Sequence, residues 1–369
     1  MANLWNYFNS PELVYQVQHF FGIEKVDSKK NDNSNQKYIV KNKFFYYLFL
    51  IGTELGDELF YGIFIPFCIH NCDNFLARRF VFVWFVLMYV GQALKEFFIE
   101  VRPQSPAIQM QKKWSNEYSL PSTHAMSSPA IAVTIVYFAL ERYEANLLLC
   151  TILTVIWISV VSWSRVYLGM HSVLDLLMGF ALSAILLIFL LPITNSIELF
   201  LATSVFGPVV LLLITIPLMV YFPRPKTNLW TPTKGDTISI AGVFVGVEIG
   251  HWLNYQMGYL NDSDVTLPLS LDFSNLIALG LRTVICLAIA GGSEFIGKII
   301  SYSLLCFYFN EDGKALKNAP NTVDNRRKNF IDLSTKFLTY FLLGFNTLFV
   351  TPLIFKYFNI QRNSFYTEI

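Results

Sequence analysis

The stretch that decides the chemistry runs from residue 164 to residue 175 and reads Ser164-Arg165-Val166-Tyr167-Leu168-Gly169-Met170-His171-Ser172-Val173-Leu174-Asp175. It lies at the edge of apolar segments. His171 and Asp175 are four residues apart, so on a helix they share one face. There the carboxylate can accept the imidazole Nδ1–H and leave Nε2 with a free lone pair, as a nucleophile requires.

Two stretches upstream carry further polar residues. Lys95 is followed seven residues later by Arg102-Pro103, and Pro121-Ser122-Thr123-His124 precedes an apolar run. Lys95, Arg102 and Arg165 together suit a group with two or more negative oxygens, which indicates phosphate. The set predicts a phosphoryl-transfer site, and nothing in it calls for a metal or another cofactor.

Each upstream stretch also has a plainer explanation. Pro103 disfavours helix at the preceding residue, so the helix that holds Lys95 is expected to end near Arg102. A lysine that reaches the membrane interface and a loop arginine would look the same. Ser122 or Thr123 can cap a helix whose free N–H groups attract an anion, but an ordinary helix start can also contain His124.

Composition predicts an integral membrane protein. The 369 residues are 54% hydrophobic and 14% charged, and the mean hydropathy is +0.46, which is too apolar for an ordinary soluble chain. The net charge of +1 builds no basic field and argues against a nucleic-acid partner. The expected partners are the bilayer and a substrate that enters from it.

The fold class predicted from this pattern is all-α, a polytopic bundle of about nine or ten spans. Apolar stretches long enough to cross about 30 Å of hydrocarbon occur at 44–69, 80–99, 125–140, 145–163, 171–192, 203–222, 236–256, 273–292 and 336–355. The stretch 295–309 holds Lys298 and could be re-entrant, and 310–335 is expected to be a charged loop without structure. We divide the chain into a polar N-terminal tail (1–43), a catalytic membrane core (44–200), and further membrane helices with a C-terminal tail (201–369).

Two regions leave alternatives open. Residues 4–22 are expected either to form a short helix at the membrane interface or to be a disordered tail. Inside the later spans lie Glu248, His251 and Arg282. Charges within a bilayer usually face a partner, so we expect Glu248 to pair with Arg282, with a role in placing a lipid headgroup as the alternative.

The three stretches resemble the motifs of the type-2 phosphatidic acid phosphatase superfamily, which are Lys-x6-Arg-Pro, Pro-Ser-x-His and Ser-Arg-x5-His-x3-Asp. The surrounding residues, Val101 to Pro106, Glu117 to Met126 and Gly169 to His171, resemble the sphingosine-1-phosphate phosphatase branch. Thr123 stands where the superfamily usually has glycine, a departure expected of that branch. The clear similarity covers residues 95–175.

This resemblance implies the roles. His171 would form a phosphohistidine, Asp175 would orient it, and His124 would protonate the leaving alkoxide. The phosphate would be held by Lys95, Arg102, Ser122, Thr123 and Arg165. The implied enzyme is a metal-independent phosphatase of sphingosine 1-phosphate and related sphingoid-base 1-phosphates, with phosphatidate or lysophosphatidate as the alternative substrates.

Other function classes remain to be separated from this one. A transporter or scaffold with a vestigial site would be expected to lack a histidine or arginine of the motifs, and none is missing. A transferase would pass the phosphoryl group or the headgroup to a second lipid.

Two arguments about membrane orientation give opposite results. The six lysines between Lys25 and Lys43 favour a cytosolic N-terminus and, by the parity of the spans, a cytosolic site. The resemblance instead implies the endoplasmic reticulum membrane and a lumenal site, which is the expectation we adopt. The acceptor sequon Asn261-Asp262-Ser263 would then be cytosolic and unglycosylated.

Overall fold

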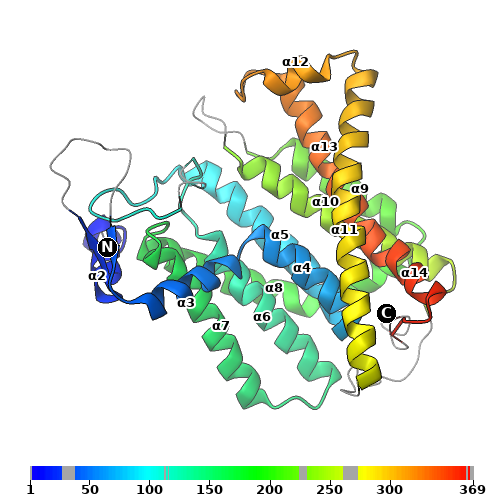
Figure 1. Ribbon diagram of the computed structural model, residues 1–369, viewed down its shortest axis with the longest axis horizontal. Helices are drawn as coiled ribbons and strands as arrows, with labels where there is room; N and C mark the ends of the chain where they lie inside the picture. Colours follow the sequence, from blue (N-terminus) through cyan, green and yellow to red (C-terminus); the bar gives the residue numbers. More distant parts are fainter. Residues whose placement is uncertain are drawn as a thin grey trace. The chain divides into compact units, whose positions relative to one another are not determined.

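The structure is a computed structural model that describes residues 2–26, 38–111, 114, 116–223, 231–260, 273–362 and 365. The sequon at Asn261 lies outside these residues. The described chain is mostly helical, with two short strands (Figure 1), which confirms the predicted all-α class. It divides into two compact units. The first comprises Met1–Tyr61, Leu87–Val136 and Glu144–Ile188, and the second comprises Gly62–Val86, Tyr137–Tyr143 and Phe189–Ile369.

The first unit contains the N-terminal helices, a small sheet, and helices or parts of helices that bear the three motifs. Its elements are α1 (Ala2–Phe8), α2 (Pro11–Phe20), β1 (Ile23–Lys25), β2 (Tyr38–Val40), α3 (Lys43–Glu54), α7 (Leu147–Tyr167), and parts of α5 (Asn74–Phe98), α6 (Thr123–Arg142) and α8 (Val173–Thr203). The strands pair antiparallel, with Ile23 opposite Val40 and Lys25 opposite Tyr38.

The second unit contains the other parts of α5, α6 and α8, the part of α4 (Glu58–Phe67) that follows Tyr61, and further helices. The further elements are the π-helical turn η1 (Cys68–Cys72), α9 (Gly207–Val220), α10 (Thr233–Gln256), α11 (Phe273–Tyr308), α12 (Gly313–Asn318), α13 (Arg326–Phe345), the π-helical turn η3 (Asn346–Val350) and α14 (Thr351–Tyr357). Helix α10 packs along α13. Small residues allow this close approach, since a Cβ on Gly246 would lie 2.2 Å from the Phe341 carbonyl oxygen.

The expected count of nine or ten spans is not confirmed. Six helical stretches in the described residues are long and apolar enough to cross a bilayer, which makes the chain a multi-pass membrane protein. They are Asn74–Phe98, Thr123–Arg142, Leu147–Tyr167, Val173–Thr203, Asn275–Tyr308 and Arg326–Tyr357. Helix α9 is apolar but shorter.

Three sequence expectations differ from the structure in detail. The stretch 44–69 is broken between α3 and α4, where the Asp57 carboxylate accepts the Glu58 N–H at 2.8 Å and starts a new helix. The stretch 295–309 is not re-entrant, because α11 continues through Lys298 without a break. The charged segment 310–335 is not structureless, because it holds α12, capped by the Asp312 carboxylate, and the start of α13.

The N-terminal region is helical, as one of the two alternatives for residues 4–22 expected. Ser10 caps α2 by accepting the Leu13 N–H at 3.2 Å, and Pro11 occupies the first turn. Val14 and Gln18 of this helix are fully buried. Residues 11–20 are therefore part of the first unit's core rather than a free tail.

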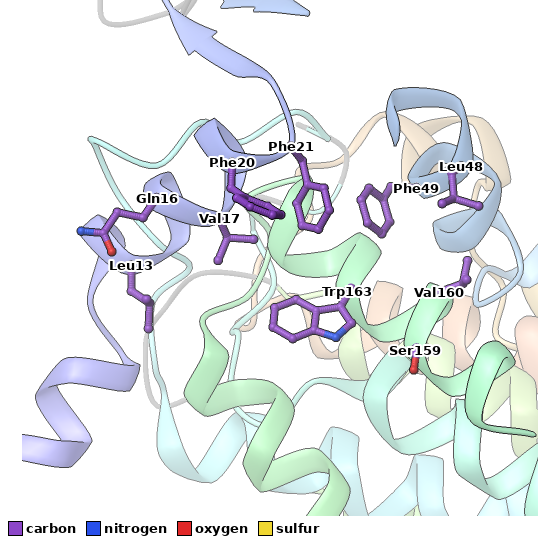
Figure 2. Close-up of a pocket in the computed structure, with 10 residues that line it drawn as sticks. All are labelled: Leu13, Gln16, Val17, Phe20, Phe21, Leu48, Phe49, Ser159, Val160 and Trp163. Carbon is purple, nitrogen blue, oxygen red and sulfur yellow. The ribbon is translucent and has the colours of Figure 1, made fainter. Parts of the chain in front are cut away.

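An apolar cavity of about 550 Å³ lies among α2, α3 and α7 (Figure 2). The lining is almost all aliphatic or aromatic, with Phe20, Phe21 and Trp163 as its largest side chains. The full set is Leu13, Gln16, Val17, Phe20, Phe21, Leu48, Phe49, Ser159, Val160 and Trp163.

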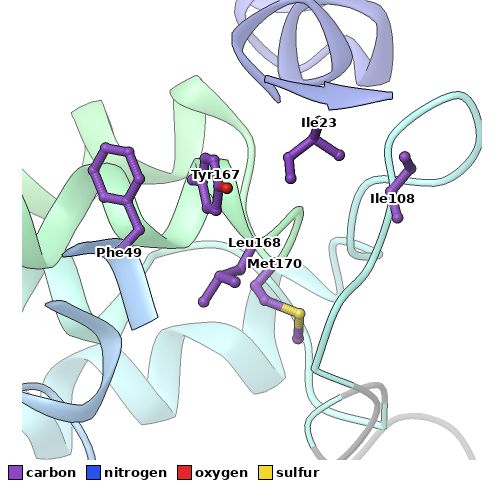
Figure 3. Packing of buried hydrophobic residues seen from close by; sticks show 6 residues of the cluster. All are labelled: Ile23, Phe49, Ile108, Tyr167, Leu168 and Met170. Carbon is purple, nitrogen blue, oxygen red and sulfur yellow. The ribbon is translucent and has the colours of Figure 1, made fainter. Parts of the chain in front are cut away.

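Next to this cavity is the buried cluster that holds the end of α7 in place. It joins β1, α3, the loop around residue 108 and the turn after α7 (Figure 3), through Ile23, Phe49, Ile108, Tyr167, Leu168 and Met170. The rings of Phe49 and Tyr167 are 4.7 Å apart between centroids, within the range of favourable aromatic pairs. The cluster contains Tyr167, Leu168 and Met170, three of the four residues that directly precede His171.

In the second unit, the expected pair between Glu248 and Arg282 is wrong. The charged neighbours of Glu248 are Glu198, Arg78 and Arg79. Arg78 donates to Glu198 at 3.1 Å, with both side chains buried. Burial of several charges is tolerated when they face one another, and here Glu198 on α8 provides the acidic partner that the sequence pattern did not identify.

Candidate active site

The turn that carries His171 is built by the end of α7. Gly169 has a φ of +67°, and a Cβ there would lie 2.2 Å from the Ile108 carbonyl oxygen, so only glycine fits. The N–H groups of Met170 and His171 both point to the Arg165 carbonyl oxygen, at 2.9 and 3.3 Å. This turn places His171 between α7 and α8, one residue before the Ser172 cap.

Gln18 of α2 clamps this turn from the N-terminal side. Its Nε2 donates to the carbonyl oxygens of Ile108 (2.8 Å) and Tyr167 (2.9 Å), and its Oε1 accepts the Ile108 N–H at 3.0 Å. The side chain is fully buried. Sequence analysis did not identify Gln18, because a glutamine in an amphipathic helix gives no signal of its partners.

Lys95 and Arg102 are brought together by a residue that we did not predict, Glu117. Lys95 Nζ donates to Glu117 Oε1 at 2.9 Å, and Arg102 Nη2 donates to Glu117 Oε2 at 2.8 Å. All three side chains are buried. A signal for Glu117 did exist, since it is the only acidic residue between Val101 and Ser122.

Arg102 also reaches the predicted nucleophile. Its Nη1 donates to the Met170 carbonyl oxygen at 2.8 Å and lies 3.3 Å from His171 Nε2. With the imidazole proton on Nδ1, Nε2 is the acceptor in this contact. Arg102 and His171 are 69 residues apart in the sequence. Their contact joins the Lys-x6-Arg stretch and the His-x3-Asp stretch in one candidate site.

Arg165 lies on α7 and is oriented by neutral groups. Its Nη1 donates to Thr53 Oγ1 on α3 and to Gln111 Oε1, the latter at 2.8 Å. Its Nε has no hydrogen-bond partner among the described residues. Among the described residues, the Arg165 side chain thus donates hydrogen bonds to neutral groups, whereas Lys95 and Arg102 both donate to the Glu117 carboxylate.

The contact between His171 and Asp175 is present but looser than expected. His171 Nδ1 and Asp175 Oδ2 are 3.5 Å apart, an ion-pair distance rather than a short hydrogen bond. The same oxygen accepts the Ser172 N–H at 2.7 Å, while the Asp175 N–H points to Ser172 Oγ at 3.2 Å. This reciprocal arrangement is a capping box. His171 precedes α8, and Asp175 both starts that helix and faces the imidazole.

The Pro-Ser-x-His stretch forms the first turn of α6. Ser122 Oγ accepts the Ala125 N–H at 3.4 Å, and the Ser122 N–H donates to the Asp175 carbonyl oxygen at 3.1 Å. Thr123 Oγ1 accepts from Lys95 Nζ at 3.2 Å. His124 packs against Gly56 in the break between α3 and α4, where an added Cβ would lie 2.3 Å from the imidazole Cδ2.

All eight predicted residues lie within the first unit. Seven are buried and linked by the contacts above, whereas the half-buried His124 follows Thr123 in the chain and is close enough to His171 and the three cations to interact electrostatically. Lys95 and Arg165 are at the ends of α5 and α7, and His124 and Asp175 are at the starts of α6 and α8. Consecutive antiparallel helices bring these four ends to the same side. The site therefore lies at one edge of the bundle, as the motif positions predicted.

The electrostatics of the loop residues suit a neutral nucleophile among cations. Burial lowers the pKa of His171 well below its usual value, and Arg102, Arg165 and Lys95 lower it further. Burial opposes ionisation of Glu117, but Lys95 and Arg102 outweigh it and lower the pKa of its carboxyl. His171 is therefore neutral at pH 7, and Glu117 is charged.

The apolar cavity lies on a different side of α7 from the site. Its α7 residues are Ser159, Val160 and Trp163, and Arg165 follows Trp163 by two positions. At about 100° per residue, Arg165 points away from the cavity by about 200°. We therefore do not include the cavity in the phosphate site.

Comparison with known proteins places this site in a class. Residues 76–197 match the PAP2 superfamily model, and this segment includes all eight predicted residues. The class is that of membrane phosphatases of phosphate monoesters.

The similarity extends over most of the chain. Sphingosine-1-phosphate phosphatase 1 of Rattus norvegicus is 35% identical over 327 residues, 87% of this chain and 74% of the relative. Sphingosine-1-phosphate phosphatase 2 of Homo sapiens is 31% identical over 331 residues, 88% of this chain and 81% of the relative. The Mus musculus phosphatase 2 is 29% identical over 367 residues, 98% of this chain and 100% of the relative. The chain belongs to the sphingosine-1-phosphate phosphatase family. No solved structure matches it.

Proposed function

We propose that this protein hydrolyses sphingosine 1-phosphate and related sphingoid-base 1-phosphates to the free base and phosphate. The observation that carries the proposal is the contact of Arg102 with both Glu117 and His171 Nε2, at 2.8 and 3.3 Å. A cation that we expect to bind phosphate thus lies beside a buried neutral imidazole, which supports the proposal. Similarity to phosphatases named for sphingosine 1-phosphate supports the choice of substrate.

In the first step, the lone pair of His171 Nε2 attacks phosphorus in line with the ester oxygen. A P–N bond forms, the P–O bond to the lipid breaks, and protonated His124 gives its proton to the departing alkoxide. Asp175, 3.5 Å from Nδ1, stabilises the positive charge that the imidazole acquires.

In the second step, water attacks the phosphohistidine while His124 accepts its proton. The P–N bond breaks, and its electron pair returns to His171 Nε2. Throughout, Lys95, Arg102 and Arg165 neutralise the charge on the non-bridging oxygens, with Ser122 and Thr123 as further hydrogen-bonding groups.

This assignment expects hydrolysis without a metal. The choice of substrate and the absence of a metal requirement are tested together on the purified protein in detergent. The substrate panel is sphingosine 1-phosphate, phosphatidate, lysophosphatidate and glucose 6-phosphate. We expect sphingosine 1-phosphate to be hydrolysed with the highest kcat/KM, unaffected by EDTA. Preference for phosphatidate or lysophosphatidate would favour a broad-specificity lipid phosphatase, and loss of turnover on chelation that magnesium restores would overturn the metal-free mechanism.

The two histidines are separated by their response to the leaving group. An aryl phosphate needs no proton on departure, so His124→Ala should recover part of its activity on that ester and accumulate phosphoenzyme. His171→Ala should be inactive on both substrates and form no acid-labile phosphate. Rescue and labelling in the His171 variant instead would reverse the two roles. If the wild type and both variants all failed to hydrolyse the substrates, a transporter or scaffold with a vestigial site would be favoured.

The proposed location is the endoplasmic reticulum membrane with the site on the lumenal side. The N-terminal helix α2 contacts the turn before His171 through Gln18, so a glycosylation sequon fused to the N-terminus should then be modified in cells. An unmodified fusion with a cytosolic N-terminus would place the site on the other face.

A further inference from the structure

Glu117 is a buried carboxylate for which the proposed reaction has no role. It contacts both cations of the Lys-x6-Arg stretch, through Oε1 to Lys95 (2.9 Å) and Oε2 to Arg102 (2.8 Å). Its backbone oxygen accepts Arg102 Nε at 3.0 Å. Three contacts from one residue thus define where the two cationic groups lie.

We propose that Glu117 is a positioning residue, which holds Lys95 and Arg102 at the separation that a bound phosphoryl group requires. The proposal rests on the proposed function, because it assigns phosphate to these cations. Two buried like charges repel each other and lose hydration, and both have long side chains with many rotamers. A carboxylate that bridges them removes both difficulties before the substrate arrives.

Donors remain for the phosphate while Glu117 stays in place. The Lys95 ammonium has three N–H groups, of which one points to Glu117 and one to Thr123 Oγ1. Arg165 Nε is unengaged among the described residues. A phosphoryl group can therefore bind Lys95 and Arg165 without displacing the carboxylate.

Arg102 transmits the effect of Glu117 to the nucleophile. One edge of the guanidinium is held by the Glu117 carboxylate and backbone oxygen, and the other edge faces the Met170 carbonyl oxygen and His171 Nε2. Because the guanidinium is planar and rigid, fixing one edge fixes the other. Glu117 thereby sets the position of Arg102 relative to His171.

A rival explanation predicts the opposite change in anion binding when the charge of Glu117 is removed. If the carboxylate merely occupied the phosphate position in the empty site, the substrate would have to expel it. Removing its charge would then strengthen anion binding, because nothing would compete for Lys95 and Arg102. Positioning predicts weaker binding after the same change.

The test measures binding of orthovanadate, a phosphate analogue, to the purified full-length protein in detergent, by inhibition and by protection against thermal unfolding. Glu117→Gln keeps the shape and removes the charge. We expect the vanadate inhibition constant to rise about 10- to 100-fold, as for residues that orient metal ligands, with a matching fall in kcat/KM. The control is Glu100→Gln, since Glu100 accepts from Asn9 and a glutamine oxygen can do the same.

Unchanged or tighter vanadate binding in Glu117→Gln would overturn the proposal. If that variant fails to fold, Glu117→Asp provides the test, because it keeps the charge but is one methylene too short to bridge both cations. Vanadate binding by Glu117→Asp equal to that of the wild type would contradict positioning. In an Arg102→Gln background the Glu117→Gln effect should shrink, whereas full additivity would contradict action through Arg102. Wild type that binds vanadate but hydrolyses no lipid phosphate would refute the proposed substrate alone.

Discussion

Replacing Gly56 by alanine tests the position of the proposed general acid. Gly56 lies in the break between α3 and α4, and its missing side chain makes room for the His124 imidazole. A Cβ at this position would lie 2.3 Å from Cδ2 and 2.9 Å from Nε2 of that ring. Carbon atoms in contact are about 3.5–4.0 Å apart, so the imidazole must move by more than about 1 Å.

The expected loss follows from this displacement. A misplacement of about 1 Å in a reacting group can cost about 100-fold in rate, or about 2.7 kcal/mol of transition-state stabilisation. Gly56→Ala should therefore lower kcat on sphingosine 1-phosphate about 100-fold. Because the ring is the end of a side chain and can turn away, the fold should persist and the thermal midpoint should change little.

The assay compares the lipid substrate with an aryl phosphate in detergent. The loss should be smaller on the aryl ester, whose departure needs no proton from His124. Gly62→Ala is the matched control, since nothing lies within 4 Å of an added Cβ there. Wild-type kcat in Gly56→Ala would refute the claim that His124 acts from this position, and an equal loss on both esters would refute its role as the acid.

Three further predictions follow from single contacts. Asp175→Asn should lower turnover about 10²- to 10⁴-fold, by analogy with catalytic triads, with KM nearly unchanged; activity within a few-fold of wild type would remove Asp175 from the mechanism. Because the pKa of His171 is lowered, its neutral form persists as pH falls through the usual value of 6.5. The fall of kcat/KM at acid pH that is due to His171 should therefore occur well below pH 6.5, and it should move to higher pH in Arg102→Gln. An acid limb that stays in place in this variant would contradict the coupling between Arg102 and His171. Gln18→Leu should leave the partners at Ile108 and Tyr167 unpaired, each costing about 1–3 kcal/mol, and a thermal midpoint equal to wild type would show that Gln18 does not clamp the turn.

Most residues of the candidate site could be named from the sequence because they fall in short motifs with fixed spacings. Spacings such as Lys95 to Arg102 and His171 to Asp175 specify which side chains share a helix end, and apolar segments specify that these ends meet a membrane edge. Consecutive antiparallel spans then bring alternate helix ends together. For this reason the predicted residues do form one cluster in the first unit.

The sequence by itself determined the membrane class and the all-α architecture, because composition and apolar run lengths need no three-dimensional information. It also predicted which cationic and histidine residues form the candidate site, because their spacings are short. Tertiary structure alone decided the number of long spans and the partners of the buried charges. The charge partners depend on contacts distant in sequence, such as that of Arg78 with Glu198. A carboxylate such as Glu117 can pair with any cation it meets, and only the folded chain specifies that it meets Lys95 and Arg102.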